Sequence, residues 1–158
     1  MRVYLASPLG FAVSTRAFME AMESALDEAV IPYINPWRGD FGAAFGEAHA
    51  LTDRAARLAA LAQVNTRIGR TNAEAIQACD TVVAVLDGVD VDSGTASEIG
   101  YAFALGKRIH GLRTDSRLIG DNEGTVVNLQ VQYFIEASGG HVLRQLAEVV
   151  ALLRGSKQ

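Results

Sequence analysis

Four carboxylates are concentrated in one segment near the middle of the chain, DGVDVDSGTASEIG at positions 87–100: Asp87, Asp90, Asp92 and Glu98. The glycines between them allow a small molecule to approach the backbone closely. A carboxylate in such a segment can attack the anomeric carbon of a sugar and form a covalent intermediate, which an acceptor then opens. The segment is the strongest indication of function, and Glu98 is the candidate nucleophile.

Two other interpretations compete for the same residues. A solvated acidic loop whose carboxylates cap the next helix would need no chemistry at all. A divalent metal is disfavoured, because no histidine stands near the carboxylates at ligand spacing and His49, His110 and His141 are scattered along the chain. We therefore expect neither a metal nor a cofactor.

The elements around this segment favour function over a solvated loop. The β-branched run Thr81–Leu86 predicts a buried strand directly before it, and the residues from Thr95 onward predict a helix. The carboxylates then lie at the carboxyl end of a strand, where ligands bind in open α/β sheets. The first turn of the helix adds free backbone N–H groups, and Glu98 stands about one turn further on.

The rest of the chain predicts alternating strands and helices. Strands are expected at Arg2–Ala6, Ile31–Asn35, Thr81–Leu86 and Lys107–Leu112. Helices are expected at Thr15–Ala29, Ala48–Leu61, Arg70–Ala78, from Thr95 onward, at Leu129–Ala137 and at Val142–Leu153. Gly39–Gly46 and Thr114–Thr125 are expected to be irregular. Such alternation predicts a doubly wound parallel β-sheet flanked by helices, and no linker divides residues 1–158, so we expect a single α/β domain.

Composition excludes several classes of partner. The chain has 158 residues, 49% of them hydrophobic, and a formal net charge of -4, which argues for a soluble domain without a nucleic-acid surface. It shows neither a signal peptide nor an apolar stretch of membrane-spanning length. The single cysteine, Cys79, excludes an intrachain disulfide and is typical of a reducing compartment. We therefore expect a cytoplasmic protein that acts on small molecules.

Other common site motifs are missing. The first predicted strand leads into Ser-Pro-Leu-Gly-Phe, without the G-x-G-x-x-G of dinucleotide sites. No Gly-Lys-Ser/Thr phosphate loop occurs, and no G-x-S-x-G elbow frames Ser7 as a hydrolase nucleophile.

Several blocks together resemble the nucleoside 2′-deoxyribosyltransferase family. These are VYLASP at 3–8, Asn72 followed by ACDTVVA at 78–84, DSGTASEIGYA at 92–102 and VNL at 127–129. They keep the family order and cover most of the chain, and the Asp-x-Gly-Thr-Ala-x-Glu-x-Gly core is fairly specific. The resemblance implies a flavodoxin-like sheet and a homo-oligomer in which neighbouring subunits complete each active site.

The resemblance also implies roles for individual residues. Glu98 resembles the nucleophile that attacks C1′, and Tyr4 resembles the tyrosine that orients it, although an ordinary packed aromatic is an equal alternative. Asp92 resembles the carboxylate that binds sugar hydroxyls. Asn128 resembles the amide that a neighbouring subunit contributes to hold the 5′-hydroxyl, and capping the helix that begins at Leu129 is compatible with that role.

The base-binding residues depart from the family in one place. Asn72 stands where many members carry an aspartate that helps to protonate the base, and an amide is not an acid at neutral pH. Water or another carboxylate would then take that role. The Ser7–Phe11 loop, with Ser7 and Pro8, is expected to line the substrate pocket together with Gly94 from the motif and Pro36-Trp37. A large aromatic such as Trp37 more often packs in a core.

The expected reaction is exchange of purine or pyrimidine bases between 2′-deoxynucleosides in nucleoside salvage. One alternative is an N-glycosidase that hydrolyses nucleosides or nucleoside 5′-monophosphates. The nucleotide enzymes tend to carry a serine where Asp92 stands, and a carboxylate about 4 Å from a dianionic phosphate costs several kcal/mol at an effective dielectric near 20. A phosphoribohydrolase is disfavoured because the chain lacks Pro-Gly-Gly-x-Gly-Thr. A non-catalytic nucleotide-binding module remains a further alternative.

Overall fold

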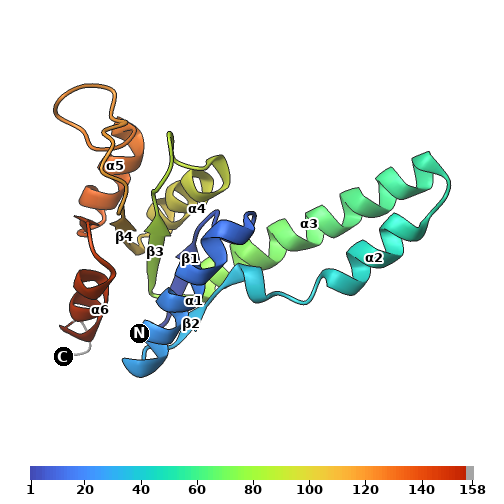
Figure 1. Cartoon of the computed structure of the whole chain (residues 1–158), viewed down its shortest axis with the longest axis horizontal. Coiled ribbons are helices and arrows are strands. Elements are labelled where there is room, and N and C mark those ends of the chain that lie inside the picture. The colour runs from blue at the N-terminus through green and yellow to red at the C-terminus, as the bar shows by residue number, and fades with distance from the viewer. Residues whose placement is uncertain (156–158) are drawn as a thin grey trace.

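Five parallel strands form one sheet in the order β2-β1-β3-β4-β5 (Figure 1). The structure is a computed structural model that describes residues 1–155. The strands are β1 (Val3–Ala6), β2 (Tyr33–Ile34), β3 (Thr81–Val85), β4 (Arg108–Leu112) and β5 (Val142–Leu143). This order and the six flanking helices make the fold a flavodoxin-like α/β fold, as expected.

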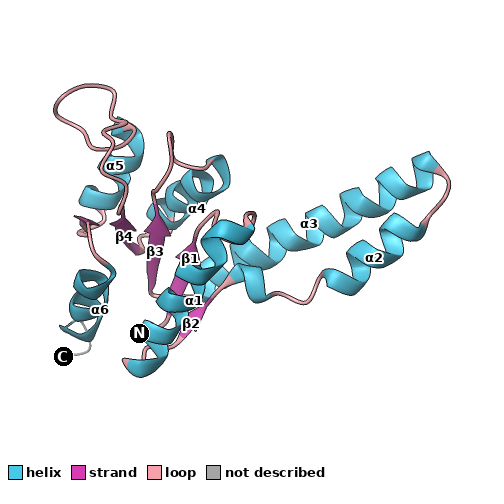
Figure 2. Ribbon diagram, viewed as in Figure 1, coloured by secondary structure: helices cyan, strands magenta, loops and turns pink. Residues whose placement is uncertain are grey.

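The helices connect successive strands and lie on both sides of the sheet (Figure 2). They are α1 (Val13–Glu28), α2 (Gly42–Ala50), α3 (Arg54–Ala78), α4 (Ser93–Ala104), α5 (Leu129–Ala137) and α6 (Leu146–Gly155). A short 3-10 helix, η1 (Pro36–Arg38), follows β2. Among residues 1–155, no helix is both long enough and apolar enough to cross a membrane.

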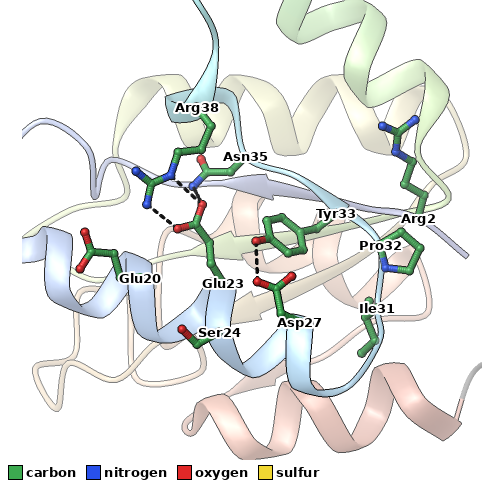
Figure 3. A pocket seen from close by; sticks show the side chains of 10 residues that line it. All are labelled: Arg2, Glu20, Glu23, Ser24, Asp27, Ile31, Pro32, Tyr33, Asn35 and Arg38. Carbon is green, nitrogen blue, oxygen red and sulfur yellow. Dashed lines mark hydrogen bonds and ion pairs between the residues drawn. The ribbon is translucent and has the colours of Figure 1, made fainter.

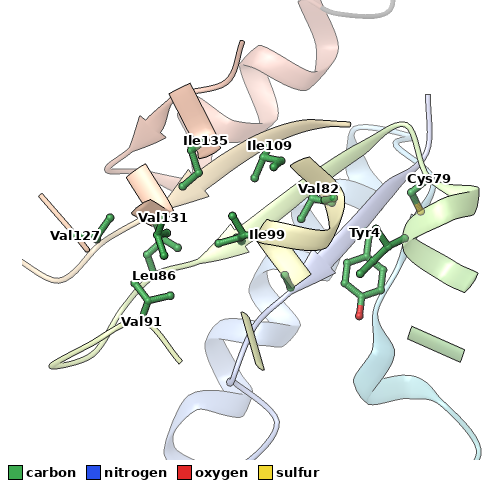
Figure 4. Packing of buried hydrophobic residues seen from close by; sticks show 14 residues of the cluster. Tyr4, Cys79, Val82, Leu86, Val91, Ile99, Ile109, Val127, Val131 and Ile135 are labelled. Atoms are coloured by element: carbon green, nitrogen blue, oxygen red, sulfur yellow. The ribbon is translucent and has the colours of Figure 1, made fainter. Parts of the chain in front are cut away.

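Alternating side chains of the strands build a core on each face of the sheet. Tyr4 and Ala6 of β1 face one cluster, which includes Ile99 of α4 and Ile135 of α5 (Figure 4). The other cluster is formed by the remaining strand positions together with α1 and α6. Because successive residues of a strand point to opposite faces, the apolar runs of β1 and β3 supply both cores at once. Tyr4 therefore faces the same layer as α4.

Helix α3 differs from the sequence prediction. The predicted helices Ala48–Leu61 and Arg70–Ala78 are replaced by a break at residues 51–53 and one continuous helix from Arg54 to Ala78. The break has a local cause, because the Asp53 side chain accepts a hydrogen bond from the Ala56 backbone N–H at 2.8 Å and caps a new helix. With α2, the N-terminal part of α3 forms a hairpin that extends away from the sheet (Figure 1).

The last strand also differs from the prediction. Residues 142–153 were expected to form one helix, but Val142–Leu143 pair with β4 as β5 and the helix begins at Leu146. The backbone N–H groups of Gly111 and Arg113 donate to the carbonyl oxygens of His141 and Leu143, at 3.0 and 2.9 Å. This two-residue strand forms by pairing with β4, and it is too short to show an alternating strand pattern in the local sequence.

Candidate functional site

The candidate site lies where the strand order reverses, between β1 and β3. In an open α/β sheet the two connections leave this point on opposite sides, so a crevice forms beyond the carboxyl ends of the strands. Helix α4 begins directly after β3 and its loop, and Glu98 stands in the second turn of this helix. Tyr4 of β1 comes to the same place from the other side of the reversal.

A hydrogen bond joins Tyr4 to Glu98. The Tyr4 hydroxyl donates to Oε1 of Glu98 at 2.6 Å, across 94 positions of sequence. The Tyr4 ring is fully buried at the border of the α4-side core, and its hydroxyl points away from the other labelled core side chains (Figure 4). Asn72 of α3 donates from Nδ2 to the same oxygen at 3.5 Å. Both donors engage Oε1, so Oε2 is the oxygen that no described residue hydrogen-bonds.

Burial controls the proton affinity of this pair. Desolvation raises the pKa of Glu98, the hydrogen bond from Tyr4 lowers it, and the nearby charge of Asp92 raises it further. Burial and the Glu98 charge both raise the pKa of Tyr4, so its hydroxyl keeps its proton and remains a donor. The arrangement presents a buried carboxylate that a tyrosine holds through Oε1, a geometry suited to nucleophilic attack by Oε2.

Asp92 caps helix α4. Its Oδ2 accepts hydrogen bonds from the Thr95 backbone N–H at 2.9 Å and from Thr95 Oγ1 at 3.2 Å. The capping interpretation of this carboxylate is therefore confirmed. Within the described chain no hydrogen bond engages Oδ1, so the same carboxylate keeps one oxygen for a ligand.

A cavity of about 490 Å³ opens in front of Glu98. Its lining combines the start of α4, the loop after β1, η1 and the α2–α3 hairpin. The sequence-predicted residues that line it are Ser7, Phe11, Pro36, Trp37, Asn72, Asp92, Gly94 and Glu98. Its size suits a small ligand, and its walls are mostly apolar with a few polar groups, as in typical small-molecule sites.

Trp37 is held rigidly in the wall of this cavity. Its indole N–H donates to the Ser7 carbonyl oxygen at 2.7 Å, and the Phe11 ring meets it edge-on with 4.5 Å between centroids. Gly10 lies directly against the indole, because a Cβ at this position would come within 2.0 Å of the ring. The loop after β1 and η1 thus form one aromatic wall, which can stack on a planar base.

Three further lining residues were not anticipated: Phe45 of α2 and Asn65 and Ile68 of α3. Positions 65, 68 and 72 share one face of a continuous helix, so a prediction of one uninterrupted helix over this region would have grouped them. The predicted gap between two helices concealed that pattern. Phe45 fell in the segment expected to be irregular.

Three predicted site residues do not line the cavity. Tyr4 lies behind Glu98 and reaches the site only through its hydroxyl. Pro8 instead accepts a hydrogen bond from the Phe11 N–H through its carbonyl oxygen, within the loop. Asn128 caps α5, where its Oδ1 accepts from the N–H groups of Gln130 and Val131, so it contributes nothing to the cavity of its own chain. No group of three or more metal-ligating side chains occurs in residues 1–155.

A larger and more open hollow, of about 980 Å³, lies beside β2 and shares no lining residue with the first cavity (Figure 3). Two of its charged side chains, Arg38 and Glu23, form an ion pair. Arg38 donates to both carboxylate oxygens of Glu23, at 2.9 and 2.6 Å, and Asn35 donates to Glu23 as well. The guanidinium of Arg38 lowers the pKa of Glu23. These contacts tie η1 to α1 and so support the wall that carries Trp37.

Comparison with solved structures supports the fold. A conserved protein from Enterococcus faecalis V583 aligns with a TM-score of 0.72 at 23% identity, covering 99% of this chain and 98% of its own. A 2-desoxiribosyltransferase from Leishmania mexicana aligns with a TM-score of 0.67 at 22% identity, over 98% and 97% of the two chains. A CMP N-glycosidase from Clostridium botulinum aligns with a TM-score of 0.57 at 20% identity, over 97% and 98%.

Sequence similarity identifies the family of the chain. No curated protein matches the chain by sequence. The family model for nucleoside 2-deoxyribosyltransferase matches residues 3–130, which include β1, the α2–α3 hairpin, the Glu98 segment and Asn128. With that match over most of its length, the chain belongs to the nucleoside 2-deoxyribosyltransferase family.

Proposed function

We propose that this protein is a nucleoside 2′-deoxyribosyltransferase that exchanges the bases of 2′-deoxynucleosides through a covalent intermediate on Glu98. The observation that carries the proposal is the Glu98 carboxylate, which faces the cavity while Tyr4 holds Oε1 at 2.6 Å. Family membership supports action on nucleosides and nucleobases as a class. The reaction is expected to need neither metal nor cofactor.

The chemistry proceeds in two displacements. Oε2 of Glu98 attacks C1′ of the deoxynucleoside, the C1′–N bond breaks, and its electron pair leaves with the base. A nitrogen of a second base then attacks C1′ from the vacated face, gives its proton to water and releases the Glu98 carboxylate, so the configuration is retained overall. Asn72 can hydrogen-bond the departing base but cannot supply its proton, which water then provides. Water in place of the second base gives slow hydrolysis.

The second candidate function is hydrolysis of a nucleoside 5′-monophosphate, which the alignment with a CMP N-glycosidase brings forward. Asp92 argues against it, because this carboxylate lines the cavity together with Glu98 and only its Oδ2 is engaged, by Thr95. A 5′-phosphate placed there would meet two carboxylates, whereas a 5′- or 3′-hydroxyl can donate to one. We expect Asp92→Ser to weaken turnover of nucleosides, and unchanged kinetics would contradict this role.

The first experiment is chromatography of deoxyinosine incubated with adenine in EDTA, with wild type and Glu98→Ala side by side. Deoxyadenosine made by the wild type and not by the variant is expected. Hypoxanthine and free deoxyribose alone would identify a hydrolase. If neither appears, pyrimidine donors and 5′-monophosphates are tested next, and failure of all of them would favour a non-catalytic binding module.

We further propose a homo-oligomer in which Asn128 enters the site of a neighbouring subunit. Its position outside the cavity of its own chain is compatible with this arrangement. Mixing the inactive variants Glu98→Ala and Asn128→Ala is then expected to restore activity, because mixed assemblies contain intact sites. No restoration after subunit exchange would contradict the proposal. The single cysteine fits a cytoplasmic enzyme of nucleoside salvage.

A further inference from the structure

Asn65 is a polar side chain of the cavity to which neither the motifs nor the chemistry assigns a role. It lines the cavity from α3, it is exposed, and it hydrogen-bonds no described residue. An amide that lines a cavity without a hydrogen-bond partner among the described residues has both a donor and an acceptor to offer a ligand.

The helix fixes the distance between Asn65 and the reacting centre. Asn65 and Asn72 are seven residues apart, which places them on the same face of α3 and about 10 Å apart along its axis. Asn72 lies within hydrogen-bond distance of Glu98. Because α3 runs from the outer tip of the hairpin toward the sheet, Asn65 lies further from the sheet than Asn72 (Figure 1).

The outer part of the cavity fits a planar aromatic ring system. Ile68 lies between the two amides on α3, and Phe45 and Trp37 line the cavity as aromatic walls. A base joined to a C1′ at Glu98 extends from Asn72 along this apolar section toward Asn65. The two-ring system of a purine extends further along this section than the single ring of a pyrimidine.

We propose that Asn65 is a specificity-determining residue that hydrogen-bonds the edge of a purine remote from the glycosidic bond. This inference rests on the proposed function, because the orientation of the base follows from C1′ at Glu98. The amide oxygen accepts from a 6-amino group, and the amide nitrogen donates to a 6-oxo group. One side chain therefore allows both adenine and hypoxanthine to bind, and purine 2′-deoxynucleosides are the substrates that use it.

The test is equilibrium binding by calorimetry in the Glu98→Ala background, where nucleosides bind without reacting. Deoxyadenosine, deoxyinosine and thymidine are compared with and without Asn65→Asp. A carboxylate accepts but cannot donate, so we expect the affinity ratio to shift about tenfold toward deoxyadenosine, which is about 1.4 kcal/mol. Thymidine affinity should change less than about twofold, because its ring does not reach position 65.

Gln63→Glu is the matched control. It adds the same charge two positions away on the opposite side of α3, outside the cavity lining, and should leave the affinity ratio unchanged. An unchanged ratio in Asn65→Asp, or an equal shift in Gln63→Glu, would overturn the inference, and so would the absence of any nucleoside binding. Base exchange by the wild type is measured separately. A shifted ratio without exchange would leave Asn65 as a base-reading residue and remove only the proposed transferase activity.

Discussion

Replacing Tyr4 with phenylalanine removes one hydrogen bond from the candidate nucleophile and little else. The Tyr4 ring is fully buried and stays in place as phenylalanine, while the 2.6 Å contact with Oε1 of Glu98 is lost. That contact lowers the pKa of Glu98 against the desolvation that raises it. Without the tyrosine, only the distant amide of Asn72 still donates to the carboxylate.

The expected shift follows from the energy of a hydrogen bond to a charged acceptor. Such a bond contributes about 1.5–3 kcal/mol, and about 1.36 kcal/mol corresponds to a tenfold change in proton affinity. Because Asn72 and entering water recover part of the loss, we expect the acid limb of kcat/KM to move upward by about one pH unit. The attack requires the ionised carboxylate, so the variant loses about tenfold of its activity on that limb and less at higher pH.

The assay is the pH dependence of kcat/KM for base exchange, in wild type and Tyr4→Phe. Tyr33→Phe is the matched control, because its hydroxyl bonds Asp27 in the other hollow, at 3.4 Å. The reasoning would be refuted by an acid limb that stays in place or moves to lower pH. A loss of equal size at every pH would show that Tyr4 orients Glu98 without changing its proton affinity.

Three predictions concern stability. Burial raises the pKa of Glu98, so its ionised form destabilises the fold as pH rises. Glu98→Gln should therefore raise the free energy of unfolding by about 1 kcal/mol at pH 7 and by less near pH 4. Urea denaturation at both pH values measures this, and a larger gain at pH 4 would contradict it. Burial lowers the pKa of His110 to about 4, and its Nε2 has no hydrogen bond among the described residues. Below about pH 6.5 the His110 side chain binds a proton in the unfolded chain but not in the folded one, so the free energy of unfolding of the wild type should fall by about 3 kcal/mol between pH 6.5 and 4. In denaturation experiments, the free energy of unfolding of His110→Leu should depend less on pH. The buried Arg113 donates to the carbonyl oxygens of Leu86, Gly88 and Arg117. Arg113→Met should therefore lower the free energy of unfolding by about 3 kcal/mol in urea denaturation, whereas Arg117→Ala, at an exposed position, should change it little. Similar behaviour of the two variants would contradict a stabilising role of these hydrogen bonds.

The local sequence determined the β3–α4 half of the site. A β-branched run, a capping aspartate and a helix are decided by interactions over a few residues, so the order strand, loop, Asp92, Glu98 could be predicted without tertiary contacts. Alternation of strands and helices also sufficed for the parallel sheet and the flavodoxin-like class. The capping role of Asn128 had the same local origin.

The tertiary structure decided which distant residues meet at Glu98. Tyr4 arrives across 94 positions through the pairing of β1 with β3, a contact that the resemblance suggested and that no local pattern specifies. Phe45, Asn65 and Ile68 join the cavity only because Asp53 restarts the helix and folds α2 against α3. Strand β5 forms by pairing with the edge of β4. Capping and periodicity act within a few residues, whereas strand pairing and hairpin packing join segments far apart, and the outer half of the site depends on these long-range contacts.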